Sequence, residues 1–180
     1  MGAREREGEA VIELRIRQIA QLFESLDPSP FHERDLDAAA AAYILDWARE
    51  LPRDRPIVIR IHLVDAATAR PEELAAAIRG YFAEEAEAVR RDLRELFAMG
   101  RLYLAVGVAA LALAILGGNL ARAVFAPPLS ALMQEGLIIL GWVANWKPLE
   151  TFLYDWLPLR RRRRLFGRLA RARIELVETA

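Results

Sequence analysis

The sequence lacks several of the residues that most often carry chemistry in proteins. Its 180 residues include no cysteine, two histidines and one lysine, Lys147. Without cysteine the chain can form no disulfide scaffold, thiolate metal site or cysteine nucleophile, and two histidines leave few ligands for zinc. It also contains no phosphate-binding glycine loop, GxSxG elbow or HExxH motif. We therefore expect a non-enzymatic protein with no catalytic residues, no bound metal and no cofactor.

Charged residues are plentiful but unevenly distributed. The 25 basic and 25 acidic side chains cancel, and the apolar content of 54% is too high for a disordered chain. No charged residue lies between Arg101 and Arg122, and only Glu135 interrupts the stretch from Arg122 to Lys147. A long apolar middle with charged ends is typical of a membrane protein.

The first candidate membrane span covers residues 102–120, which read LYLAVGVAALALAILGGNL. At about 1.5 Å per residue, a helix of about 19 residues covers the roughly 30 Å hydrocarbon core of a bilayer. A chain of 180 residues could hardly bury such a helix on all sides. We therefore expect a transmembrane helix rather than the core helix of a soluble protein.

The second candidate span, residues 129–146, is about as long but less apolar. Trp142, Trp146 and Lys147 at its end suit a membrane interface. A true second span would form a helical hairpin with the first, connected by residues 119–128; a re-entrant or interfacial segment is the alternative. The polar residues of this candidate span are Ser130, Gln134, Glu135 and Asn145.

The distribution of arginines predicts how these spans are oriented. Clusters precede the first span and follow the second, whereas the connection between them holds only Arg122. The positive-inside rule then places both chain ends in the cytoplasm and the connection outside. The first ten residues contain no apolar run, so we expect no cleavable signal peptide. The two spans together predict a multi-pass protein.

Three stretches alternate between apolar and polar residues, which predicts strands with one buried face. They cover residues 10–17, 57–64 and 173–177, and the last could equally be the frayed end of a helix. The first contains VIELRI and the last RIELVE, a similarity that suggests pairing between the two.

Two helices are expected around the second strand. Residues 36–51 carry an apolar stripe that includes Tyr43 and Trp47 and end at Pro52, so strand, helix and strand predict a parallel pair with a crossover. A second helix starts at Pro71 and runs into the first span, although Gly80 and Gly100 could bend it. Its heptad-like stripe either covers the sheet or forms a short coiled coil. The stripe comprises Phe82, Ala86, Val89, Leu93 and Leu96.

The predicted fold is an α+β membrane protein with a small one-faced sheet, a crossover helix, and a long helix running into a two-helix transmembrane hairpin. Residues 1–98 form a cytoplasmic α+β domain that includes the long helix. Residues 99–147 form the hairpin. Residues 148–180 form a basic interfacial tail that could return to the sheet as a strand.

Glu135 invites a functional interpretation. A carboxylate in hydrocarbon is costly, and such a group faces a helix contact, a partner or water. Ser130, Gln134 and Asn145 share a helical face with Glu135 at its edge, and the first span offers small residues for that face to pack on. In a structural interpretation Glu135 reaches the external interface or Arg122; in a functional one it lines a cation or proton path in an oligomer.

Residues 27–37 gather a histidine, several acids and an arginine beside a turn. His32 among carboxylates could serve acid–base or metal chemistry. The simpler interpretation, which we prefer, is a turn fixed by two prolines and followed by a helix capped by Asp35 or Asp37.

Aromatic and basic residues accompany the end of the second span. Such bands lie at headgroup depth and bind anionic lipid. Nucleic acid is the alternative ligand for the arginine run, but its place directly after a span favours lipid, and we expect no nucleic-acid partner. The candidate lipid-headgroup residues are Trp142, Trp146, Lys147, Tyr154, Trp156, Arg160, Arg161, Arg162, Arg163 and Arg164.

Two stretches, IELRIRQIAQLFESLDPSPFHERDLD and GLIILGWVANWKPLETFLYDWLPLRRRRRL, resemble a group of uncharacterised bacterial membrane proteins. Proteins of that group combine a small cytoplasmic α+β domain, two membrane spans and a basic tail. The resemblance implies a location in the bacterial inner membrane and draws attention to residues 27–31, Trp142 and residues 154–158. It implies no activity.

These observations together favour a non-enzymatic, oligomeric, membrane-anchored interaction or scaffold module. Its expected partners are anionic lipid headgroups, further copies of the chain and an unidentified protein. The alternative is a small oligomeric ion or proton channel with Glu135 near its axis.

Overall fold

The computed structural model describes residues 4–6, 8–23, 36–64 and 70–178. The chain divides into two compact units. Unit 1 comprises Met1–Ala88 and Arg161–Ala180, and unit 2 comprises Val89–Arg160. The fold is mixed α+β, with a small parallel sheet and one long apolar helix, as the sequence predicts.

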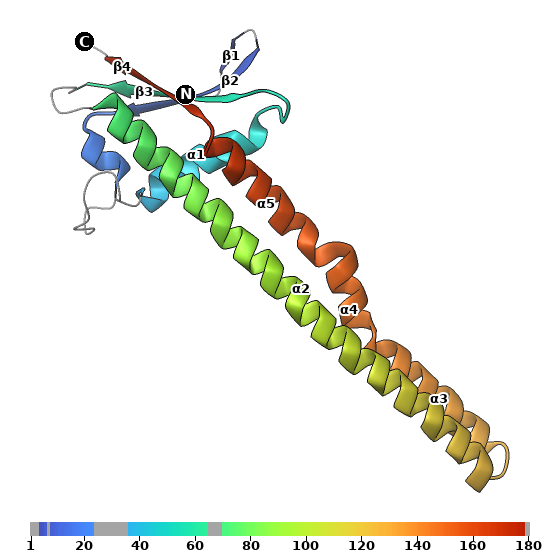
Figure 1. The fold of residues 1–180 in the computed structure, drawn as a ribbon. Helices are drawn as coiled ribbons and strands as arrows, with labels where there is room; N and C mark the ends of the chain where they lie inside the picture. The colour runs from blue at the N-terminus through green and yellow to red at the C-terminus, as the bar shows by residue number, and fades with distance from the viewer. Residues whose placement is uncertain (1–3, 7, 24–35, 65–69, 179–180) are drawn as a thin grey trace. The chain divides into compact units, whose positions relative to one another are not determined.

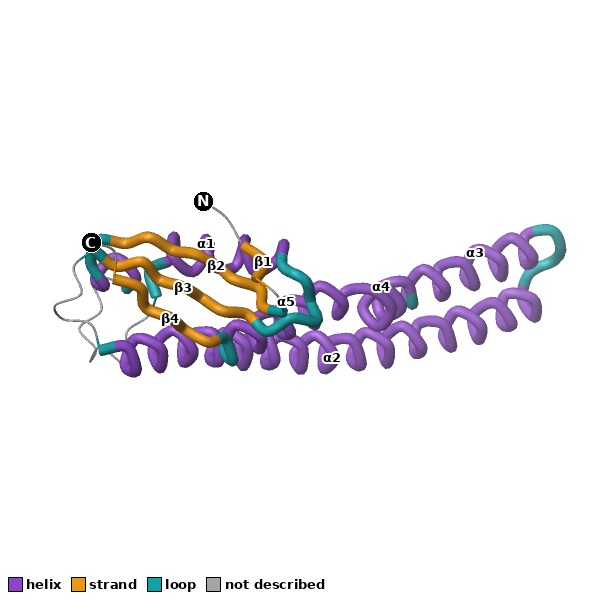
Figure 2. The backbone as a smooth tube through the Cα atoms, turned by 90° about the horizontal axis from the view of Figure 1, so that it is seen from above, coloured by secondary structure: helices purple, strands orange, loops and turns teal. Residues whose placement is uncertain are grey.

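Unit 1 is built around a sheet whose described strands lie in the order β1–β2–β3–β4 (Figures 1 and 2). The strands β2 (Glu9–Ile16), β3 (Ile57–Leu63) and β4 (Arg173–Glu178) run parallel, and the short β1 (Arg4–Arg6) pairs antiparallel with β2. The two predicted N-terminal strands are confirmed, and the C-terminal segment is a strand rather than a frayed helix end.

One face of this sheet forms the core of unit 1. Alternation places Ile12, Leu14, Ile59 and Ile61 on it, and all four are buried. The helices α1 (Ala38–Glu50), α2 (Pro71–Val124) and α5 (Trp156–Leu169) contribute the residues of unit 1 that cover this face (Figure 2). Burying an aliphatic side chain of this kind stabilises the fold by roughly 1.5–3 kcal/mol. The covering residues include Ile44, Leu74, Ile78, Phe82, Phe166 and Leu169.

The expected pairing between the first and last strands is wrong, because β3 lies between them. Residues 12–14 and 174–176 both read Ile-Glu-Leu, and both align with residues 59–61 of β3 in the same register. The sequence similarity therefore reflects a common neighbour. The strands β2 and β4, on either side of β3, each align an Ile-Glu-Leu sequence with residues 59–61 of β3.

This register places Arg60 between two glutamates on the second face of the sheet. Its Nη2 lies 2.7 Å from Oε2 of Glu175, and its Nη1 lies 3.7 Å from Oε1 of Glu13. The hydrogen bonds from Arg60 hold the pKa of the Glu175 carboxyl below its ordinary value of 4.5. The three strands are thus joined by charge on one face and by apolar packing on the other.

The crossover helix α1 begins with Asp37 as its N-cap. The Asp37 carboxylate accepts hydrogen bonds from the backbone amides of Ala39 and Ala40, as one of the two predicted caps requires. Ile44 is fully buried, whereas Tyr43 is exposed, contrary to the predicted apolar stripe. The buried side of α1 therefore centres on its small and aliphatic residues rather than on its aromatic ones.

Helix α2 continues without interruption from Pro71 to Val124, so neither Gly80 nor Gly100 breaks it. The expected connection at residues 119–128 is too long, because only residues 125–128 separate α2 from α3 (Leu129–Ala144). The chain then passes through α4 (Trp146–Glu150) and the π-helical segment η2 (Thr151–Asp155) into α5.

The residues of the heptad-like stripe of α2 pack against other residues of the same chain. In unit 1 the Phe82 ring stacks on Phe166 with 6.2 Å between centroids. In unit 2 Val89 is buried, and Leu96 and Leu159 line a common groove. These contacts favour intramolecular covering over a coiled coil between copies.

Among the described residues, one helix, α2, is long and apolar enough to cross a membrane. Only 22% of its most apolar stretch is buried, whereas the core helix of a soluble protein is mostly buried. Helix α3 has 16 residues. Such a helix is about 24 Å long, shorter than the roughly 30 Å hydrocarbon core. A second span would therefore need residues beyond α3.

Candidate functional site

Small and polar residues form much of the contact between α2 and α3 in unit 2. The Asn145 side chain donates hydrogen bonds from Nδ2 to the Gly107 carbonyl at 3.0 Å and to the Gly141 carbonyl at 2.9 Å. A methyl group placed on Gly118 would lie 2.8 Å from Cγ of Gln134, closer than packed atoms tolerate. The small residues of α2 thus let the polar face of α3 approach closely, as the structural interpretation of that face requires.

Most large apolar side chains of this helix pair point away from the contact, although Leu111 lies against Gly141 and Leu137 against Gly117. Leu113 is 69% exposed on α2, and Leu132 is 69% exposed on α3. In water such surfaces would be buried, whereas in lipid they need no protein cover. Other exposed members of the set are Val106, Val108, Leu116, Leu120, Ile139, Leu140, Trp142 and Val143.

The structure separates the four candidate intramembrane residues into two groups. Ser130 and Asn145 are buried and Gln134 is half-buried, and the last two contact α2. Glu135 is exposed and makes no ion pair with any described residue. The expected contact between Glu135 and Arg122 is therefore not formed within the chain.

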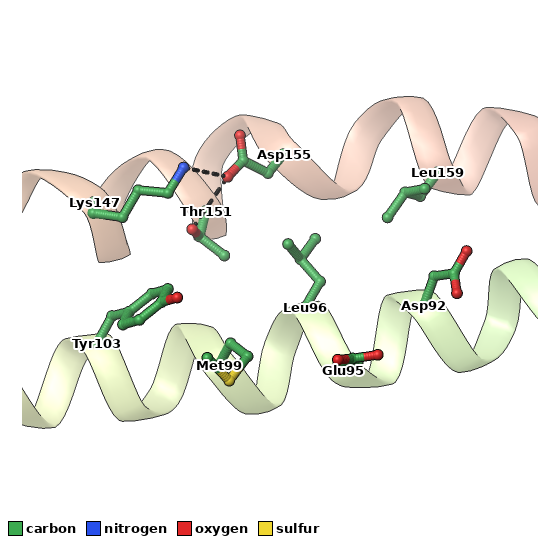
Figure 3. Close-up of a pocket in the computed structure, with 9 residues that line it drawn as sticks. All are labelled: Asp92, Glu95, Leu96, Met99, Tyr103, Lys147, Thr151, Asp155 and Leu159. Carbon is green, nitrogen blue, oxygen red and sulfur yellow. Dashed lines mark hydrogen bonds and ion pairs between the residues drawn. The ribbon is translucent and has the colours of Figure 1, made fainter.

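A groove of about 410 Å³ opens in unit 2 between α2 and the run from Lys147 to Leu159 (Figure 3). Its apolar lining consists of Leu96, Met99 and Leu159, and η2 forms part of one wall. Isolated π-helical turns are frequent at functional sites. The polar residues that line the groove are Asp92, Glu95, Tyr103, Lys147, Thr151 and Asp155.

Lys147 is held at one end of this groove by a network of acceptors (Figure 3). Its Nζ lies 3.1 Å from Oδ2 of Asp155, the contact drawn in Figure 3. It also lies 3.3 Å from Oε2 of Glu150. The Thr151 hydroxyl donates to the same Asp155 oxygen at 3.2 Å. These contacts place a cationic side chain with two carboxylate partners at this end of the groove.

Sequence reasoning assigned Lys147 to a lipid band but missed the groove and its partners. Thr151 and Asp155 follow the only lysine at intervals of four residues, and this spacing was the available signal. The groove combines an apolar lining with charges of both signs. Across the described part of the chain, no group of three or more His, Asp or Glu residues could hold a metal ion.

The candidate lipid-headgroup residues are mostly exposed. Trp142, Trp146 and Tyr154 are exposed, and so are all five arginines of the run from Arg160. Trp156 differs, because its Nε1 donates to the Phe152 carbonyl at 2.9 Å and the Arg160 guanidinium lies 5.3 Å from its ring centroid. Trp156 therefore stabilises the helix and positions an arginine.

The region around His32 lies outside the described residues, as does Asp35, so the interpretation of residues 27–35 stays a prediction. Comparison of the chain with known protein families, with curated proteins and with solved structures finds no match.

Proposed function

We propose that this chain is an integral protein of the bacterial inner membrane that acts as a non-enzymatic, oligomeric, membrane-anchored interaction or scaffold module. In this proposal α2 and the run from α3 into α4 cross the membrane as a hairpin. The sheet of unit 1 lies in the cytoplasm with both chain ends, where it is available to a protein partner.

The observation that carries the proposal is the reversed packing of unit 2. Its helix contact buries Gly107, Gly118 and Asn145, while leucines such as Leu113 are exposed. Helices in lipid associate through small and hydrogen-bonding residues, because lipid tails solvate leucine as well as a protein core does. Such packing is typical of helices whose outer surface meets hydrocarbon.

The aromatic and basic residues that follow α3 in the chain support the orientation. Exposed Trp146 and Tyr154 are of the kind enriched at membrane interfaces. The exposed arginines at residues 160–164 would each gain about 1 kcal/mol near an anionic leaflet. The groove at Lys147 adjoins the same band and suits a lipid headgroup by its mixed lining.

The absence of cysteine makes a direct topology test simple. We would introduce single cysteines by Ala126→Cys in the connection after α2 and by Arg53→Cys in unit 1, and label intact bacteria with a membrane-impermeant maleimide. We expect labelling at position 126 in intact cells and at position 53 only after permeabilisation. Leu113→Cys is the matched control that should resist aqueous label under both conditions.

Two outcomes would count against the proposal. Extraction of the wild-type chain by alkaline carbonate would show that it is not integral to the membrane. Labelling of positions 53 and 126 from the same side would show that α2, which lies between them in the chain, does not cross.

A second candidate function, a small oligomeric ion or proton channel, is favoured by one observation. Glu135 is the one charged residue of α3 and is exposed, and a carboxylate inside a membrane needs water or a partner. If it lines a pore, Glu135→Gln should change ion flux in liposomes while the oligomer remains intact. An unchanged flux would exclude this role.

A further inference from the structure

Residues 102–146 contain only two charged side chains, and they have opposite signs. They are Arg122 near the end of α2 and Glu135 on α3. Both are exposed, and neither forms an ion pair with any residue that the structure describes. Two complementary charges in one apolar stretch are therefore both available to a partner.

The helix contact fixes where these two charges lie on unit 2. Gln134 packs against Gly118, so Glu135 and Arg122 lie within about one helical turn of that level. Arg122 follows the buried Ala121 and Glu135 follows Gln134, which places each charge about 100° around its helix from the contact. The two helices run antiparallel. A step of one residue along each helix, from Ala121 to Arg122 and from Gln134 to Glu135, therefore rotates toward the same side of the helix pair.

The surroundings of Glu135 on that side are apolar. Leu132 is 69% exposed, and Ile139 and Trp142 are each 62% exposed, at helical spacings from Glu135 of three, four and seven residues. Inside a membrane, a carboxylate among such residues is costly unless it is paired or reaches water. The face thus requires a partner that supplies a cation and an apolar surface.

We propose that this partner is a second copy of the chain, with Glu135 of each copy paired with Arg122 of the other. A face that carries one charge of each sign is self-complementary under two-fold symmetry, because a single rotation forms both pairs. The inference rests on the proposed membrane location. It also leaves no free Glu135 carboxylate for an ion path.

The test uses the full chain in vesicles of phosphatidylethanolamine and phosphatidylglycerol. Donor and acceptor dyes on Arg53→Cys report dimerisation by energy transfer, in copies with Arg122→Glu or Glu135→Arg. Each reversal alone puts like charges opposite each other twice and should weaken dimerisation by about tenfold or more. A mixture of the two reversed copies restores both pairs, and its energy transfer should return to that of the wild type.

Arg91→Glu is the matched control, an exposed charge reversal on α2 outside the apolar stretch, and it should leave energy transfer unchanged. Where a reversal prevents insertion, Glu135→Gln and Arg122→Gln replace it, and each should weaken dimerisation.

Three results would overturn the inference. In the first, the mixture stays monomeric while both reversals in one chain restore the wild-type state, which means that the two charges pair within a copy. In the second, Arg91→Glu weakens dimerisation as much as Glu135→Arg. In the third, the neutral variants dimerise as the wild type does. Carbonate extraction of the same samples tells this failure from a failure of the membrane proposal, since only the latter releases the wild-type chain.

Discussion

The two units of this chain are packed in opposite ways. Unit 1 buries large aliphatic and aromatic side chains such as Ile59 and Phe82, and it places Arg60 and its glutamates on the second face of the sheet. Unit 2 buries Gly107 and Asn145 in its helix contact and exposes large apolar residues. In the proposed membrane location this difference follows from the solvent that each surface meets, which is water for unit 1 and hydrocarbon for unit 2.

The comparison also explains how one chain accommodates both units. Unit 2 forms the middle part of the connection between two neighbouring parallel strands, β3 and β4. A parallel connection must cross over a face of the sheet, usually through a helix. Here the chain leaves the sheet through the first part of α2 and returns through α5. The rest of α2 and α3 form the apolar helix pair between these two segments. The segments of α2 and α5 that belong to unit 1 therefore pack in the core of the sheet, where they contribute buried residues such as Phe82 and Phe166.

The largest predicted difference between the units comes from the same change at two leucines. Leu63→Ala in β3 removes a side chain that is 1% exposed and should cost about 2–5 kcal/mol of unfolding free energy. Leu113→Ala in α2 removes one that is 69% exposed and should change stability by less than about 0.5 kcal/mol. Thermal unfolding of both variants in mild detergent measures this. Equal losses would contradict the opposite packing of the two units.

The second prediction concerns the close approach of α2 and α3. A Cβ atom at Gly107 would lie 2.7 Å from Oδ1 of Asn145 and 3.0 Å from the Ala144 carbonyl, so Gly107→Ala should destabilise the contact by about 2 kcal/mol. Gly136→Ala is the matched control, since nothing lies within 4 Å of its Cβ position. It should be neutral or stabilise the helix by up to about 1 kcal/mol. If both variants behave alike in thermal unfolding, the small residues do not define the contact.

The third prediction tests the charged face of the sheet through pH. The pKa of Glu175 is lowered by Arg60, so its stabilisation is fully present above about pH 4.5 and is lost as the pH falls through the lowered folded-state value. At pH 6, Glu175→Gln should cost about 1.5 kcal/mol. The difference from wild type should shrink as the pH falls below 4.5. A constant difference across this range would mean that the charge at this position does not stabilise the sheet.

Local patterns were sufficient to predict much of unit 1. Alternation in β2 and β3 has a period of two residues and needs no knowledge of the rest of the chain. The last strand could not be decided in this way, because six residues fit a strand or a helix end equally well. What selects the strand is its register against Arg60, a residue more than a hundred positions earlier.

The helix contact and the groove of unit 2 were predictable only in part, because they too depend on contacts between residues that are distant in the sequence. The periodicity of α3 predicted that Ser130 and Asn145 share a face, and it placed Glu135 at the edge of that face without deciding its direction. The groove depends on the space between α2 and η2, which no local pattern encodes. Asp92 and Asp155 are brought to one groove by the fold although 63 positions separate them in the chain.

The smallest predicted effect distinguishes hydrogen bonding from close packing as the basis of the helix contact. Asn145→Ala removes two bonds to backbone carbonyls, from Gly107 and Gly141. In lipid such bonds contribute only about 0.6–1.7 kcal/mol, because the separated helices find other partners for the same groups. We expect a loss near the lower value in thermal unfolding, with Asn119→Ala, an exposed asparagine of α2, unchanged. A loss larger than that of Gly107→Ala would mean that the asparagine holds the helices together and that the small residues only make room for it.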